Sequence, residues 1–168
     1  ELSSNINLTV TVSTNQGASG VYIEDIAGLV IDGKGNEVNG QLSRRCIHII
    51  NSEVNLQNLI ITNGVGGILI SGVSQATLTT CTVSDNIYVG VYMTGSSILT
   101  MVTCSIVDNT VSGVTGGAGL HHAFAGTVTL ISCLISRNVA SGGPGGGLRS
   151  DAESGSMLLE NCTVSNNL

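Results

Sequence analysis

A short motif that recurs four times in one register is the feature that most constrains this chain. The motif is apolar-x-x-Cys-x-(Val/Ile)-x-x-Asn, and it occupies residues 78–86, 101–109, 130–138 and 159–167. Its cysteines are Cys81, Cys104, Cys133 and Cys162, at successive steps of 23, 29 and 29 residues. A fixed period of about 20 to 50 residues indicates a repeat architecture. The chain is therefore expected to fold as an array of similar units.

A second segment precedes the motif in each repeat, and it begins with a glycine followed by an apolar residue. It occupies residues 67–70, 90–93, 119–122 and 147–150, and weaker copies of the two segments lie at 21–23, 29–40, 47–49 and 56–63. These runs are short, alternate between apolar and polar side chains, and are bounded by Gly, Ser and Asn. Such runs are typical of β-strands, and none has apolar residues at helical spacing. The pattern predicts an all-β chain without a substantial helix.

Short strands that repeat in register predict a parallel β-solenoid. A single repeat cannot bury its apolar face, whereas stacked repeats bury a continuous core. Three ladders of inward side chains are expected: Leu56, Leu78, Met101, Leu130 and Leu159; Leu59 with the four cysteines; and Ile61, Val83, Ile106, Ile135 and Val164. The asparagines at 86, 109, 138 and 167 should stack at a turn and bond neighbouring rungs.

The repeat register makes further predictions about particular side chains. The cysteines should pack as free thiols, because parallel rungs hold Cβ atoms farther apart than a relaxed disulfide prefers. Asp108 and Arg137 occupy the same turn position in successive rungs and should form a salt bridge. His122 should point into the core. The longer repeats have extra residues at 110–119 and 139–147, which we expect to be surface loops.

Composition excludes some function classes. Only 10% of the residues are charged, and 11 acidic residues outnumber 5 basic ones, giving a net charge of −6. Nucleic acid requires a basic face, so it is not an expected partner. Polar residues interrupt every apolar stretch well before the roughly 18 residues of a membrane-spanning helix, so no transmembrane segment is expected.

Three features together carry a resemblance to a known family: the Ile-Asp-Gly-Lys-Gly-Asn segment at 31–36, the Cys-Thr-Val-Ser-Asp-Asn type ladders, and Gly-Gly-Gly-Leu at 145–148. They resemble right-handed parallel β-helix proteins of the pectin-lyase-like class, which include polymorphic outer-membrane and adhesin-type repeats. The resemblance covers nearly the whole chain. It implies a right-handed single-stranded parallel β-helix of about six rungs. We expect one domain over residues 1–168, as a processed piece or fragment of a longer solenoid, with an extracellular or cell-surface location.

The chain departs from the enzymes of that class. It has no Asn-Thr-Asp, Asp-Asp, Gly-His-Gly and Arg-Ile-Lys set as in polygalacturonases, and no Asp-Pro-His-Glu as in mannuronan epimerases. Pro144 is the single proline, so the Arg-x-Pro-x-x-Arg of pectate lyases is absent. The Phe-x-x-Asn of the outer-membrane repeats is replaced by apolar-x-x-Asn. These departures favour a non-enzymatic protein and leave an enzyme as the alternative.

Functional side-chain types align on the outer face of the glycine-led strands. Alternation places Tyr22, His48, Leu69, Tyr92, His121 and Arg149 in one row, flanked by Glu24, Thr94 and Asp151. The predicted ligand-binding residues are His48, Tyr92, His121, Arg149 and Asp151. An aromatic ring can cover an apolar sugar face, and arginine can bind the carboxylate of an acidic sugar. No cofactor is expected, and no metal, because His121 and His122 lack a third ligand.

Three functions remain open from the sequence. The leading hypothesis is a non-enzymatic scaffold that presents the row to a polysaccharide or a protein partner. The alternative is a polysaccharide lyase or another carbohydrate-active enzyme, with His121 as general base beside Asp151 or Arg149. A third is an accessory structural subunit of a larger assembly that docks end-on, near Leu8 and Leu168. Polar residues on an outer face also occur without any ligand.

Overall fold

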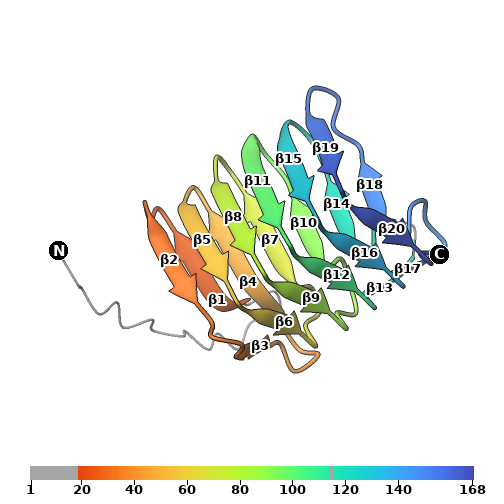
Figure 1. Cartoon of the computed structure of the whole chain (residues 1–168), viewed down its shortest axis with the longest axis horizontal. Coiled ribbons are helices and arrows are strands. Elements are labelled where there is room, and N and C mark those ends of the chain that lie inside the picture. The colour runs from red at the N-terminus through yellow and green to blue at the C-terminus, as the bar shows by residue number, and fades with distance from the viewer. Residues whose placement is uncertain (1–18, 114–115) are drawn as a thin grey trace.

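The described part of the chain is a rod of stacked strands. The computed structural model describes residues 19–113 and 116–168. Leu8, near which end-on docking was expected, lies outside these residues. Figure 1 shows successive turns side by side along the rod, from red near the N-terminus to blue near the C-terminus. The strands form three parallel sheets of six strands and one sheet of two. The predicted all-β solenoid of about six rungs is confirmed.

Each turn of the chain passes through three sheets, which we call A, B and C. Sheet A contains β1 (Ser19–Glu24), β4 (Arg45–Ile50), β7 (Ile68–Ser71), β10 (Val91–Met93), β14 (Leu120–His122) and β18 (Leu148–Ser150). Sheet B contains β2 (Leu29–Asp32), β5 (Glu53–Gln57), β8 (Gln75–Thr79), β11 (Ser97–Val102), β15 (Gly126–Ile131) and β19 (Ser156–Glu160). Sheet C contains β3 (Glu37–Asn39), β6 (Ile60–Thr62), β9 (Thr82–Ser84), β12 (Ser105–Val107), β16 (Leu134–Ser136) and β20 (Thr163–Ser165).

The core lies inside the rod and includes the predicted apolar ladders, although Leu159 and Val164 on the last rung are exposed. Leu56 pairs with Leu78, Leu78 with Met101, and Met101 with Leu130, and all four side chains are buried. The ladder on sheet C is equally regular and begins one rung earlier than predicted, because Val38 pairs with Ile61. Stacking like residues on like residues packs the interior without aromatic rings.

The predicted asparagine ladder is present at the turn that follows sheet C. Asn86 Nδ2 donates to Asn109 Oδ1 at 2.8 Å, Asn109 Nδ2 to Asn138 Oδ1 at 2.9 Å, and Asn138 Nδ2 to Asn167 Oδ1 at 3.0 Å. The same amides donate to main-chain carbonyls, such as that of Val83. Buried polar groups need hydrogen-bond partners, and the ladder provides them for backbone atoms that the turn would otherwise leave unpaired.

The cysteines pack as free thiols, as predicted. The thiols of the repeat motif lie at the corner between sheets B and C and contact backbone carbonyls, for example Cys104 Sγ to Leu78 O at 3.4 Å. Cys46, to which the sequence analysis gave no role, lies under the asparagine ladder, 3.7 Å from Asn86 Oδ1. Burial raises the pKa of Cys46 to about 11. These thiols therefore act as small packing residues.

Both ends of five sheet C strands, β6, β9, β12, β16 and β20, are marked by a residue in the left-handed backbone region. Before the strand these residues are Asn58, Thr80, Thr103, Ser132 and Asn161, and after it Asn63, Asp85, Asp108, Arg137 and Asn166, with φ between 52° and 58°. L-residues other than Asn and Asp disfavour this region. Arg137 reaches Asp108 through two hydrogen bonds, of 2.7 and 2.6 Å, which confirms the predicted salt bridge. The guanidinium lowers the pKa of Asp108.

The prediction that residues 110–119 and 139–147 are loops is wrong for the first three residues of each. β13 (Thr110–Ser112) and β17 (Val139–Ser141) form a two-stranded parallel sheet. Val111 and Ala140 are buried in a small apolar cluster beside the main core. The two insertions are 29 residues apart and stack in register, so their first residues pair like any other rung.

Candidate functional site

The row predicted on the outer face of sheet A is in register along the rod. Each residue is the pairing partner of the next: Tyr22, His48, Leu69, Tyr92, His121 and Arg149. Strand alternation places these side chains outward because their neighbours Ile47, Ile68 and Met93 are buried. The outer face of sheet A thus carries one continuous line of side chains, in which His121 is largely covered and only 8% exposed.

The structure brings four of the five predicted binding residues together and leaves the fifth apart. Tyr92, His121, Arg149 and Asp151 are neighbours on three successive rungs. His48 is separated from Tyr92 by the rung that carries Leu69. Its ring lies edge-on to Tyr22, and its Nε2 is 2.9 Å from the Ser71 hydroxyl.

His121, Asp151 and Arg149 form a charged network. His121 Nε2 is 2.9 Å from Asp151 Oδ2, and Arg149 Nε is 2.9 Å from Oδ1 and 2.7 Å from Oδ2 of the same carboxylate. Arg149 and, to a smaller extent, His121 lower the pKa of Asp151. The Arg149 guanidinium thus already has a carboxylate partner without any ligand.

This network borders a hollow of about 890 Å³, which we call the Tyr92 hollow. Its walls are Tyr92, Thr94, Gly95, Ser96, His121, Ala123, Phe124, Ala125, Asp151, Glu153 and Ser154. The Tyr92 and His121 rings lie 5.1 Å apart at a 35° tilt. Phe124 is 66% exposed and has φ of 70°, so a bulky apolar residue is displayed at a strained turn position. The hollow therefore combines aromatic surface with carboxylates and several hydroxyls.

A comparison with family models gives one match over most of the chain. The model described as a right-handed beta helix region matches residues 2–143. The chain belongs to the right-handed β-helix family. No match is found among curated proteins or among solved structures. Because one fold hosts many functions, the function of this β-helix has to be argued from its site.

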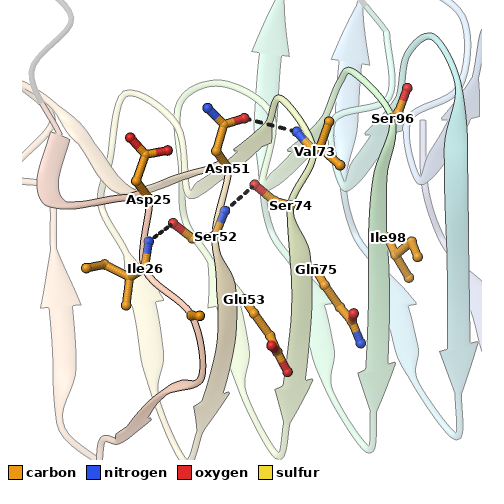
Figure 2. A pocket seen from close by; sticks show the side chains of 11 residues that line it. Asp25, Ile26, Asn51, Ser52, Glu53, Val73, Ser74, Gln75, Ser96 and Ile98 are labelled. Atoms are coloured by element: carbon orange, nitrogen blue, oxygen red, sulfur yellow. Dashed lines mark hydrogen bonds between the residues drawn. The ribbon is translucent and has the colours of Figure 1, made fainter.

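A second hollow lies on earlier rungs of the β-helix, at the same edge between sheets A and B (Figure 2). It measures about 480 Å³ and shares Ser96 with the Tyr92 hollow. Figure 2 shows that its polar atoms bond one another across rungs. Ser52 Oγ accepts from the Ile26 amide at 3.1 Å, and Ser74 Oγ accepts from the Ser52 amide at 3.3 Å. Asn51 Oδ1 accepts from the Val73 amide at 3.2 Å.

These bonds assign the second hollow a structural role at the corner of the rod. The serines continue as a ladder, because Ser97 Oγ accepts from the Ser74 amide at 3.2 Å. Ser52, Ser74 and Ser97 are buried. Their steps of 22 and 23 residues match the repeat, so this ladder could have been predicted from the sequence.

Phe124, Glu153 and Ser154 also line the Tyr92 hollow, and the sequence did not predict them as site residues. Phe124 is the only phenylalanine of the chain, but no repeat position marks it. These residues lie between sheets A and B in turns that differ in sequence and length from rung to rung. The repeat therefore gave no register for them.

In the described residues of this β-helix, no helix is long and apolar enough to span a membrane.

Proposed function

We propose that this β-helix is a non-enzymatic binding module whose Tyr92 hollow holds a segment of a neutral polysaccharide. The observation that carries the proposal is the meeting of Tyr92, exposed Phe124 and the Asp151 and Glu153 carboxylates in one hollow. Binding sites typically pair apolar and aromatic walls with a few polar groups that fix orientation. An aromatic face suits the apolar face of a sugar ring, and the carboxylates accept hydrogen bonds from its hydroxyls.

Charge distinguishes neutral from acidic sugars as ligands. Asp151 and Glu153 line the hollow, and the chain carries a net charge of −6. Arg149, which the sequence suggested as a partner for a uronate, is already paired with Asp151. An acidic polymer would have to compete with that carboxylate and would be repelled by Glu153. These contacts support a neutral ligand. The location that we propose for such a polysaccharide-binding module is extracellular or at the cell surface.

The test is binding of neutral and acidic polysaccharides to the wild-type chain and to the variants Tyr92→Ala and Phe124→Ala. We expect binding of a neutral polymer that each variant weakens at least about tenfold. Tyr22→Ala is the matched control, because Tyr22 belongs to the same row and lies outside the hollow. Circular dichroism checks that all variants fold. Equal loss in the control, or binding of acidic polymers only, would contradict the proposal.

A carbohydrate-active enzyme is the second candidate, favoured by the 2.9 Å contact between His121 and Asp151. A carboxylate that orients an imidazole is a recurring arrangement for a general base. Elimination at a uronate also requires a cation for the sugar carboxylate. Unsaturated uronate product that disappears in His121→Ala would replace the binding module with a lyase. No interaction with any polysaccharide would leave a protein partner or a structural role in a larger assembly.

A further inference from the structure

His122 occupies a position inside the rod where earlier rungs have aliphatic side chains. It follows His121 in β14, pairs with Met93, and Met93 pairs with Ile70. Its side chain is fully buried, as are those of Met93 and Ile70. The prediction that His122 points inward is confirmed. An ionisable ring has thus replaced an aliphatic side chain in the core ladder.

The ring is incompletely hydrogen-bonded. Its Nδ1 lies 3.3 Å from the Ser150 hydroxyl, and its buried Nε2 has no hydrogen-bond partner within the described residues. A protonated imidazole donates from both nitrogens, so protonation would place a charged, unpaired N–H in the core. Burial lowers the pKa of His122, and the neighbouring His121 lowers it further, while the Ala125 backbone acts in the opposite direction.

No opposite charge faces the ring from the elements packed against it. Tyr92 on β10, His121 on β14 and Arg149 on β18 belong to the outer row of sheet A. Asp151 is held by His121 and Arg149, and Glu153 is exposed. The neighbours of the ring are uncharged: Met93 on the preceding rung, the Ser150 hydroxyl, the Ala125 backbone and Gly155. The charge of a protonated His122 would therefore remain uncompensated in the closed rod.

The segment that covers His122 also forms one wall of the Tyr92 hollow. A Cβ atom at Gly155 would lie 2.6 Å from His122 Cε1, so the ring packs directly against this segment. The Asp151 amide donates to the His122 carbonyl at 2.9 Å. The same segment supplies Asp151, Glu153 and Ser154 to the hollow. A displacement of this segment that hydrates the His122 ring therefore moves a wall of the hollow.

We propose that His122 is a proton-operated latch for the wall formed by residues 151–155. While His122 is neutral the segment stays packed, and its protonation releases the segment and opens the hollow. Because burial favours the neutral form, closure is fully stable above the ordinary histidine pKa of 6.5 and weakens as the pH falls below it. The open population then rises by up to about tenfold per pH unit. Release of a bound polysaccharide on acidification rests on the proposed function, but the latch does not.

Hydrogen–deuterium exchange of peptides covering residues 148–160 tests the latch without any ligand. After correction for intrinsic exchange, we expect opening in the wild type to rise about fivefold between pH 6.5 and pH 5.5, because half of the open-state imidazoles are already protonated at pH 6.5. In His122→Met, which restores the residue type of Met93, the rise should disappear. His48→Gln is the control and should keep it. An unchanged rise in His122→Met, or none in the wild type, would overturn the latch.

A second measurement uses the wild type alone, in case His122→Met fails to fold. Nuclear magnetic resonance of the His122 Cε1 proton should give an apparent pKa below 6.5, and a value at or above 6.5 would overturn the proposal. The experiments distinguish failure of the latch from failure of the proposed function. Acid-induced exchange without polysaccharide binding leaves the latch standing, whereas binding without acid-induced exchange leaves only the binding module.

Discussion

The inner and outer sides of the same strands obey different rules in this β-helix. Inside, each residue lies between similar residues, as in the ladder of Leu56, Leu78, Met101 and Leu130. Outside, the row on sheet A changes from tyrosine to histidine, leucine and arginine. An interior ladder excludes water only if successive side chains match in shape, whereas an outer residue meets no such restriction. The inner side therefore specifies the fold, and the outer side is free to carry a site.

His121 and His122 show the contrast within one strand. His121 lies on the outer side, where its Nε2 is 2.9 Å from Asp151 Oδ2. His122 faces the core, where burial disfavours the charged form.

The corners of the rod also differ, in how regularly they repeat. The corner between sheets B and C repeats one backbone conformation, whereas both hollows lie at the variable edge between sheets A and B.

The largest effect should come from breaking the asparagine ladder, with Asn109→Ala. The Asn109 amide bonds Asn86, Asn138 and the carbonyls of Val83 and Val107, and its removal leaves several buried polar groups unpaired. Each such group costs about 1–3 kcal/mol, so we expect the free energy of unfolding to fall by about 4 kcal/mol. Urea denaturation measures it.

The control for the ladder is Asn55→Ala, an exposed asparagine of β5. It should change the free energy of unfolding by less than about 0.5 kcal/mol, as is usual for surface substitutions. If Asn109→Ala costs no more than this control, the ladder is not what holds the turns together.

The second prediction compares the two faces of β11 directly, through Met101→Ala and Val102→Ala. Met101 is fully buried and Val102 is half-buried on the outer side. Removing a buried methionine side chain costs about 2–5 kcal/mol, so we expect about 3 kcal/mol for Met101→Ala. Val102→Ala should cost less than about 1 kcal/mol. Similar values from thermal or urea unfolding would remove the distinction between the inner and outer sides.

The smallest effect should be a gain of stability from Thr103→Asn. Thr103 is exposed at the corner between sheets B and C with φ of 54°, where the rungs of Asn58 and Asn161 have asparagine. A β-branched residue is strained in this region, and asparagine is not. We expect the free energy of unfolding to rise by about 0.5–1 kcal/mol. Thr100→Asn, within β11, is the control and should give no gain. A loss in Thr103→Asn would show that the Thr103 side chain has a role of its own.

Much of the fold could be predicted because equivalent residues recur in four successive repeats. Cys81, Cys104, Cys133 and Cys162 fixed the register, and with it the apolar ladders, the asparagine ladder and the outward row. The same register predicted the Asp108–Arg137 pair and the burial of His122. It fails where the repeat changes length: it predicts loops at β13 and β17, although their 29-residue step also sets a register.

The sequence by itself determined which residues share a ladder, because a strand alternates its two sides and equivalent positions in successive rungs must stack. Only the tertiary structure decided which outward residues act together. It placed Phe124 and Glu153 beside Tyr92, tied Arg149 to Asp151, and left His48 apart. It also left Nε2 of His122 without a hydrogen-bond partner among residues 19–113 and 116–168. These contacts depend on turns of unequal length and on side-chain geometry, which follow no period and so cannot be obtained from a repeat.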